Sequence, residues 1–340
     1  MIVALFSYRY CFHINNKLRR WSGLEVNPLN AKLTAVKEEI SKVLRGKDDE
    51  IDMILCAMLA GGHILLEDIP GVGKTTLAVA LSRSMSLSYR RMQFTPDVLP
   101  SDILGFSLLD QKTGDFTYRP GAIFTNLFLA DEINRTSPKT QSALLEVMEE
   151  GSVSVDGVTR ALDKPFFVIA TQNPIGASGT QKLPDSQLDR FFIRLSLGYP
   201  DHKAATEILM GKSSQSMDDV QVVMSGEEIL QMQKEADAVF VKEELLEYIV
   251  SLTEKTRGYE YLAQGISPRG SIAILKLAKA YAYYMDRNFL APDDIHAVFY
   301  AVCNHRLLLN TKAKAAGLGP REILNQILSQ VPIPRISLQS

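Results

Sequence analysis

A glycine-rich segment at residues 68–76 has the residue types and spacing that bind phosphate. It reads Asp-Ile-Pro-Gly-Val-Gly-Lys-Thr-Thr. The apolar run at 63–67 before it predicts a short strand, whereas residues 75–85 return to the apolar spacing of a helix. A strand, a tight loop and a helix in this order form the context in which a loop holds the phosphates of a nucleotide.

Each residue of this loop has an expected role. Gly71 and Gly73 let backbone N–H groups converge on phosphate oxygens, and the helix N-terminus adds partial positive charge. Lys74 is expected to reach the β- and γ-phosphates, and the Thr75 hydroxyl to ligate Mg²⁺. The expected nucleotide contacts are Pro70, Gly71, Val72, Gly73, Lys74, Thr75 and Thr76. Asp68 stands where the strict pattern has glycine. A simple glycine-rich turn with an exposed lysine is the alternative.

Two adjacent carboxylates, Asp131 and Glu132, follow an apolar run at 127–130. Ligands bind at the C-terminal ends of strands in open α/β sheets, so both carboxylates should lie near the phosphate loop. Asp131 is expected to support Mg²⁺, and Glu132 to act as the general base that polarises the attacking water. Taken alone, the pair could be the solvated end of a strand. Together with the loop, it predicts binding and hydrolysis of ATP.

The remaining apolar patterns describe elements that could position these residues. Two helices separated near Gly46 are expected at 31–58. Strands are expected at 63–67, 89–94, 127–130, 166–170 and 192–197. Near-continuous apolar strands that alternate with helices predict a parallel sheet covered on both faces.

Two hairpins interrupt this scheme. The alternating residues at 152–158 include Asp156-Gly157, a strong hairpin signal because the central turn residues need positive φ. A weaker pattern joins 106–109 to 116–118. Strand signals cease after Pro200. The expected organisation is an N-terminal extension at 1–30, an αβα nucleotide-binding core at 31–200, a smaller all-helical domain at 201–332 and a tail at 333–340.

Composition argues against several classes of protein. The formal net charge of −2 argues against a chain that coats nucleic acid, since clustered Lys and Arg drive that binding. The three cysteines have the spacing of neither a disulfide framework nor a metal site, so a reducing, cytoplasmic setting is expected. No stretch approaches the roughly 18 to 20 apolar residues that span a bilayer.

Six sequence blocks, in order, resemble the MoxR-type AAA+ ATPases. They include Leu-Ala-Asp-Glu-Ile-Asn-Arg at 129–135, Ala-Thr-Gln-Asn-Pro at 170–174 and Leu-Asp-Arg-Phe at 188–191. The other three blocks are 65–76, 93–102 and 138–146. The resemblance covers about 31–332, and Thr136-Ser137 depart from the usual pattern. It implies an αβα core followed by a helical lid, and a ring, usually a hexamer, with ATP bound between neighbouring subunits.

The resemblance also implies roles for four further residues. Asn173 is expected to be the first sensor, placed between the γ-phosphate and the water. Arg190 is expected to be the arginine finger that reaches the neighbour's ATP, with Arg194 as a weaker candidate. Arg269 corresponds to the second sensor, which grips the γ-phosphate from the lid. The alternatives are a turn cap for Asn173, structural salt bridges for Arg190 and Arg194, and an exposed cation for Arg269.

Local physical chemistry bears on two of the polar side chains. Ser267-Pro268-Arg269 has the pattern of an N-cap, a first helical residue and a first-turn cation. A cation there opposes the helix dipole by about 0.3 to 1 kcal/mol, so another interaction should favour it. Gln93, at the end of a predicted strand, could hydrogen-bond Glu132 and restrain this base until substrate binds. A strand-end amide satisfied by the backbone is the alternative.

The leading functional expectation is a chaperone-like ATPase that remodels a partner protein. Members of the family often work with partners that carry a von Willebrand factor type A domain. A DNA-acting motor is a second candidate, because related rings grip nucleic acid with hairpins like that at 153–158. That hairpin carries an acid, Asp156, and one cation at its far end, Arg160. This charge pattern is unfavourable for binding the phosphates of DNA. A slow, nucleotide-gated binding module is a third.

Overall fold

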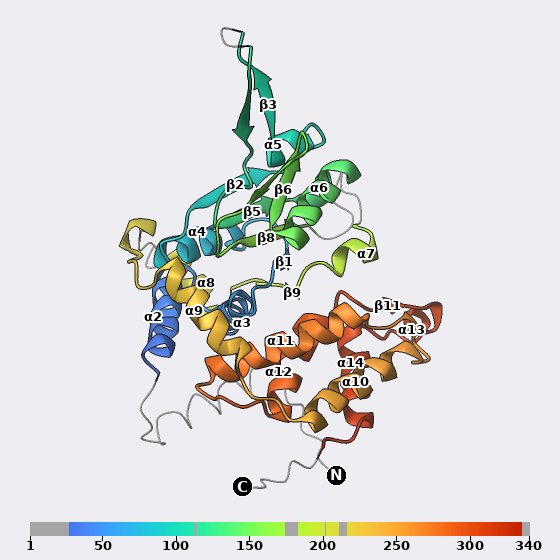
Figure 1. The fold of residues 1–340 in the computed structure, drawn as a ribbon. Coiled ribbons are helices and arrows are strands. Elements are labelled where there is room, and N and C mark those ends of the chain that lie inside the picture. Colours follow the sequence, from blue (N-terminus) through green and yellow to red (C-terminus); the bar gives the residue numbers. More distant parts are fainter. Residues whose placement is uncertain (1–26, 112–113, 174–182, 201, 211–215, 335–340) are drawn as a thin grey trace.

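A five-stranded parallel sheet lies at the centre of the molecule (Figure 1). The computed structural model describes residues 27–111, 114–173, 183–200, 202–210 and 216–334. The strand order is β2-β5-β8-β1-β9. The strands are β1 (Ile64–Glu67), β2 (Tyr89–Gln93), β5 (Leu127–Asp131), β8 (Phe167–Gln172) and β9 (Ile193–Leu195). All adjacent pairs are parallel, which confirms the predicted sheet.

Alternate strand residues face two separate hydrophobic cores. Leu66 and Leu129 pack on one face with α2 (Pro28–Val43), α3 (Asp48–Leu59) and α4 (Lys74–Ser84). Leu65 and Phe128 pack on the other face, which is covered by α5 (Pro100–Leu104) and α6 (Pro138–Glu150). Because side chains alternate along a strand, a strand buried on both faces is apolar throughout. The near-continuous apolar runs in the sequence have this origin.

The lid follows the sheet and is mainly helical (Figure 1). Its main helices are α8 (His202–Leu209), α9 (Gly226–Asp237), α10 (Glu243–Arg257), α11 (Pro268–Tyr284), α12 (Pro292–Cys303), α13 (Thr311–Ala315) and α14 (Pro320–Gln330). It also contains a short antiparallel ribbon of β10 (Leu262–Gln264) and β11 (Leu308–Leu309), which the all-helical prediction missed. Buried residues of α3, α9 and α11 share one hydrophobic cluster, so packing is continuous from core to lid.

Both predicted hairpins form. The ribbon of β3 (Gly105–Leu109) and β4 (Phe116–Pro120) projects away from the sheet at the top of Figure 1. The shorter hairpin pairs β6 (Ser152–Val155) with β7 (Val158–Ala161). Its turn places Asp156 at φ 53° and Gly157 at φ 74°, as the sequence pattern requires. The predicted N-terminal extension and C-terminal tail lie mostly outside the described residues.

Candidate functional site

The loop between β1 and α4 has the backbone that phosphate binding requires. Gly71 and Gly73 have φ of +86° and +97°, in the left-handed region. Gly73 is the N-cap of α4, and a Cβ added there would lie 2.6 Å from Leu44 Cδ1. The positive φ therefore selects glycine at this position, whereas the end of the Leu44 side chain could move to make room. Thr75 and Thr76 follow in the first turn of α4.

Lys74 is the cation of this loop. Its ammonium donates to the backbone carbonyls of Asp68 at 2.8 Å and Ile69 at 3.3 Å. Burial lowers the pKa of Lys74, whereas the nearby charges of Asp68, Asp131 and Glu132 act to raise it. The acids at the end of β5 are thus within electrostatic reach of the phosphate loop, as the sequence predicted. A nucleotide's phosphates would replace the two carbonyls as partners for this cation.

Asp68, which stands where the strict pattern has glycine, connects the loop to the residues that follow β9 through hydrogen bonds. Its Oδ1 accepts from Ser196 Oγ at 2.7 Å and from the backbone N–H of Gly198 at 3.0 Å. Its Oδ2 accepts from the backbone N–H of Leu197 at 2.6 Å. The side chain is buried, so these three bonds supply the partners that the buried carboxylate needs. Nothing in the local sequence indicates this long-range contact.

Both carboxylate oxygens of Asp131 are engaged at the end of β5. Oδ1 accepts from Thr171 Oγ1 at 2.6 Å. Oδ2 accepts from Arg91 Nη2 at 2.6 Å, and Arg91 was not among the predicted site residues. A carboxylate fixed in this way beside the Thr75-bearing helix fits the oxygen-rich surroundings that Mg²⁺ prefers. When bound, that ion would neutralise charge on the phosphates.

Glu132 is fixed by its backbone and by two side-chain partners. Its φ is 58°, a left-handed conformation that costs a non-glycine residue energy. Its N–H donates to Thr171 Oγ1 at 2.9 Å. Its carboxylate accepts from Arg135 Nη1 at 2.7 Å and from Asn173 Nδ2 at 2.9 Å. A strained residue held by several partners is typical of functional sites.

The amide that contacts Glu132 differs from the one expected. Gln93 Oε1 accepts from Arg91 Nη2 at 3.1 Å, and in the described residues it makes no hydrogen bond to Glu132. Gln93 pairs with Asp131 in the register between β2 and β5, so it lies one residue short of Glu132. Asn173, from the end of β8, takes the place predicted for Gln93.

Comparison with known proteins places this site in a family. Residues 63–193 match the profile of the ATPase family associated with various cellular activities (AAA), and residues 254–327 match that of the AAA lid domain. The chain is 36% identical over 308 residues to Chaperone MoxR1 of Mycobacterium tuberculosis, which covers 88% of this chain and 81% of that protein. The chain belongs to the MoxR-type AAA+ ATPases.

Two further relatives extend this finding along the chain. The Bacillus subtilis protein YeaC, described as uncharacterized, is 46% identical over 311 residues, covering 91% of this chain and 96% of YeaC. A crystal structure of a Cytophaga hutchinsonii protein, assigned as an ATPase, superposes with a TM-score of 0.83 at 39% identity. That likeness covers 90% of this chain and 96% of the other. The AAA+ fold of core and helical lid is thereby confirmed.

The three arginines with roles expected from the family resemblance form ion pairs with Glu149 or Glu67. Arg190 Nε is 3.4 Å from Glu149 Oε2, and Arg269 Nη2 pairs with the other oxygen of the same carboxylate. Arg194 is committed elsewhere: it pairs with Glu67 at 2.9 Å and donates to Asn304 of the lid. Of the two candidates for the finger, Arg190 has the more exposed side chain, 33% against 23% for Arg194. Ser267 caps α11 before Arg269, as predicted.

Proposed function

We propose that this chain binds ATP with Mg²⁺ and hydrolyses it in a ring of identical subunits. The observation that carries the proposal is the placement of Glu132, whose carboxylate contacts Asn173 and Arg135 within electrostatic reach of Lys74. In this proposal Lys74 and the loop N–H groups bind the phosphates, and Thr75 and Asp131 hold the metal ion. Glu132 then removes a proton from the attacking water, which Asn173 orients.

Hydrolysis in this proposal needs a neighbouring subunit. Arg190 and Arg269 share Glu149 at the end of α6, and their side chains are 33% and 47% exposed. In the described residues neither contacts the phosphate loop. Charge on the transferring phosphoryl group must still be neutralised, and an arginine supplied by a second protein molecule achieves this in some P-loop enzymes. A head-to-tail contact of this kind closes into a ring if the rotation between subunits allows it, and six subunits are expected from the family.

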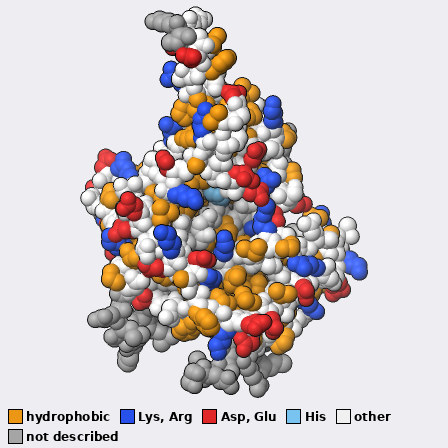
Figure 2. All heavy atoms as spheres, in the orientation of Figure 1, with side chains coloured by type: hydrophobic (Ala, Val, Ile, Leu, Met, Phe, Trp, Pro, Cys, Tyr) orange, Lys and Arg blue, Asp and Glu red, His pale blue; other side chains and the backbone are white. Residues whose placement is uncertain are grey.

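The proposed client is a protein, and the β3–β4 ribbon supports this choice. Its strands expose Phe106 (44%), Leu108 (48%), Leu109 (53%) and Phe116 (75%). Figure 2 shows hydrophobic side chains along this projection. Exposed apolar clusters of this kind mark sites of protein contact. Such a surface suits an apolar segment of a partially unfolded protein.

The shorter hairpin gives no support to a DNA-acting motor. Its cation, Arg160, lies 3.7 Å from the centre of the Tyr118 ring and donates to the carbonyl of Val158 at 3.1 Å. The guanidinium of Arg160 therefore already contacts Tyr118 of β4 and the backbone of its own hairpin, which makes it a poor phosphate ligand. A partner with a von Willebrand factor type A domain is proposed on the family resemblance alone, and a cytoplasmic setting on the few, widely spaced cysteines. No helix in the described ranges is long and apolar enough to cross a bilayer.

ATP turnover of the purified chain tests the enzymatic proposal. Wild-type protein should release phosphate from ATP with Mg²⁺, and Lys74→Ala should bind ATP far more weakly because it removes the loop's cation. Calorimetry measures binding, and phosphate release measures turnover. Equal affinity in wild type and Lys74→Ala would exclude the site.

A reduced, unfolded model substrate such as α-lactalbumin tests the role of the ribbon. Phe116→Ser should bind this protein at least several-fold more weakly while hydrolysing ATP normally. Leu209→Ser is the matched control, since Leu209 is 89% exposed on α8 and lies outside the ribbon. An equal loss of α-lactalbumin binding in both variants would indicate non-specific hydrophobic binding instead of a client site on the ribbon.

A further inference from the structure

Arg190 and Arg269 come from different parts of the fold but meet at one anion. Arg190 follows α7 (Asp185–Leu188) of the core, and Arg269 is the second residue of α11 in the lid. Both guanidinium groups pair with the carboxylate of Glu149. Guanidinium groups bind carboxylate and phosphate with the same planar geometry. A phosphate that displaces Glu149 would therefore contact both arginines.

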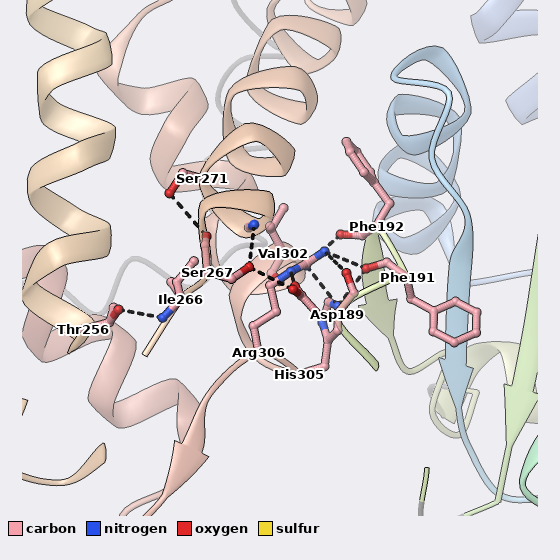
Figure 3. A network of polar contacts seen from close by, with 11 residues as sticks. Asp189, Phe191, Phe192, Thr256, Ile266, Ser267, Ser271, Val302, His305 and Arg306 are labelled. Carbon is pink, nitrogen blue, oxygen red and sulfur yellow. Dashed lines mark hydrogen bonds and ion pairs between the residues drawn. The ribbon is translucent and has the colours of Figure 1, made fainter. Parts of the chain in front are cut away.

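Three residues beside these arginines, Asp189, Ser267 and Arg306, connect the core with the lid, and we call them the joint (Figure 3). Arg306, which follows α12, donates through Nε to Asp189 Oδ1 at 2.7 Å. Ser267 donates through Oγ to Asp189 Oδ2 at 2.8 Å. Asp189 immediately precedes Arg190, and Ser267 is the N-cap two residues before Arg269. The Asp189 carboxylate thus accepts a hydrogen bond from the N-cap of the helix that carries Arg269. Asp189 is also the residue directly before Arg190 in the core.

Arg306 holds the same segment of core backbone at further points. Its side chain is 2% exposed. It donates to the carbonyls of Asp189 at 3.2 Å, Phe191 at 2.7 Å and Phe192 at 3.0 Å. A Cβ at Gly270 would lie 3.0 Å from Arg306 Cδ, so glycine leaves room for this side chain. The ion pair with Asp189 is needed here, because removing this carboxylate would leave the guanidinium charge buried and uncompensated.

We propose that Asp189, Ser267 and Arg306 are positioning residues that align Arg190 and Arg269 as one two-armed site for the phosphate of the neighbouring subunit's ATP. The inference rests on the proposed function, in which Arg190 acts between subunits. None of the three touches ATP in this proposal. They set the relative placement of core and lid, and so the distance between the two guanidinium groups. Transition-state contacts are sensitive to errors of this kind: a shift of about 1 Å can cost about 100-fold in rate.

Ser267→Ala is the sharpest variant, because changing buried Arg306 risks unfolding the chain. It removes the bond to Asp189 and also the cap bond, in which Ser267 Oγ accepts from Gly270 N–H at 3.2 Å. Ser225→Ala is the matched control. Ser225 caps α9 and accepts from Glu228 N–H at 3.3 Å, so it loses a similar cap without touching the joint.

The expected result separates positioning from stability. Ser267→Ala should bind ATP with wild-type affinity and assemble, but its kcat should fall about tenfold or more. Ser225→Ala should keep a kcat near wild type. Equal kcat values in the two variants, or a loss of ATP affinity in Ser267→Ala, would overturn the inference.

Mixing subunits gives a second readout that a purely structural defect would not produce. Lys74→Ala subunits keep intact arginines, and Ser267→Ala subunits keep an intact phosphate loop. Mixed rings should therefore regain activity, because some interfaces pair the two intact halves. If Arg190→Ala recovers when mixed with Lys74→Ala but Ser267→Ala does not, the joint is not a positioning device. If neither mixture recovers in rings shown to be mixed, the intersubunit role of Arg190 itself fails.

Discussion

The amide of Asn173 donates to the carboxylate of Glu132 over 2.9 Å. The residue expected to sense the γ-phosphate thus contacts the residue expected to activate water. They follow β5 and β8, which are adjacent parallel strands, so both emerge at the same edge of the sheet. Arg135 holds the second oxygen of Glu132 at 2.7 Å. Each carboxylate oxygen has a further lone pair, so a water can bind Glu132 while Asn173 and Arg135 hold the side chain in place.

Glu132→Gln should separate binding from chemistry. Glutamine keeps the size and the hydrogen-bonding oxygen, but it cannot accept the proton of the attacking water. ATP should bind with nearly wild-type affinity, and turnover should fall by about 10² to 10⁴, the usual contribution of a general base. Calorimetry and single-turnover hydrolysis measure the two effects. Glu150→Gln on the exposed end of α6 is the control, and unchanged turnover in Glu132→Gln would exclude this residue as the base.

Asp68→Gly restores the strict loop pattern but should destabilise the protein. The substitution deprives Ser196 Oγ and the N–H groups of Leu197 and Gly198 of their shared acceptor. The N–H of Leu197 is the buried one of these donors, and a buried group left without a partner costs about 1 to 3 kcal/mol, so the free energy of unfolding should drop by about that amount. ATP affinity should also decrease, because the loop loses its anchor to β9. Urea unfolding and calorimetry check both, and a more stable glycine variant would contradict the structural role.

Sequence patterns gave the main features of the fold because they are local. Apolar runs located the strands, the Asp156-Gly157 pair located a turn, and Ser267 located the start of α11. Contacts between distant segments were missed. The ion pair of Arg91 with Asp131 depends on which strands lie next to each other, and so does the contact of Asp68 with the residues after β9. Spacing along the chain does not encode strand order. The same reason explains why the hydrogen bond expected between Gln93 and Glu132 is not seen: the register between β2 and β5 pairs Gln93 with Asp131.

The arginines show a further limit of local patterns. The family resemblance indicated roles for Arg190, Arg194 and Arg269, but not their partners. That Arg190 and Arg269 share Glu149 depends on how the lid packs against the core. Arg194 shows the reverse case, since its contacts to Glu67 and Asn304 tie it to its own subunit.

A buried acid should make stability depend on pH. Asp52 is fully buried between α3 and α11, beside Lys37 Nζ at 2.5 Å and the hydroxyl of Tyr284. Burial raises its pKa from 3.8 to about 6, although the charge of Lys37 opposes the shift. The folded protein therefore retains a proton that the unfolded chain releases between these values. This contribution to stability is present below about pH 4 and is lost as the pH rises through about 6.

Asp52→Asn isolates this contribution. Between pH 5 and pH 7 the wild type should lose roughly 1 kcal/mol of unfolding free energy relative to Asp52→Asn. Urea unfolding at the two pH values measures the difference. Glu150→Gln, which changes an exposed acid at the end of α6, should follow the wild type. A constant difference between wild type and Asp52→Asn across this range would show that Asp52 does not titrate there.

Replacing the two candidate finger arginines should give different defects. Arg190→Ala should bind ATP, assemble and hydrolyse slowly, with a loss of about 10³ or more, because only an exposed ion pair is removed from its own subunit. Arg194→Ala should mainly destabilise the chain, since it strips Glu67 and Asn304 of their partner. Thermal unfolding and phosphate release distinguish the two. The opposite pattern would assign the finger to Arg194.

Mixing Arg190→Ala with Lys74→Ala tests whether the finger acts between subunits. Each mutant alone should be nearly inactive, because one lacks the finger and the other lacks the loop cation. In a mixed ring, some interfaces pair the intact Arg190 of one subunit with the intact phosphate loop of its neighbour. Those interfaces should restore part of the wild-type turnover, in proportion to how often they form as the mixing ratio is varied. Specific activity of the wild type should likewise rise with protein concentration as rings assemble. If mixed rings are shown to form and remain as inactive as their parents, Arg190 does not serve a neighbouring subunit.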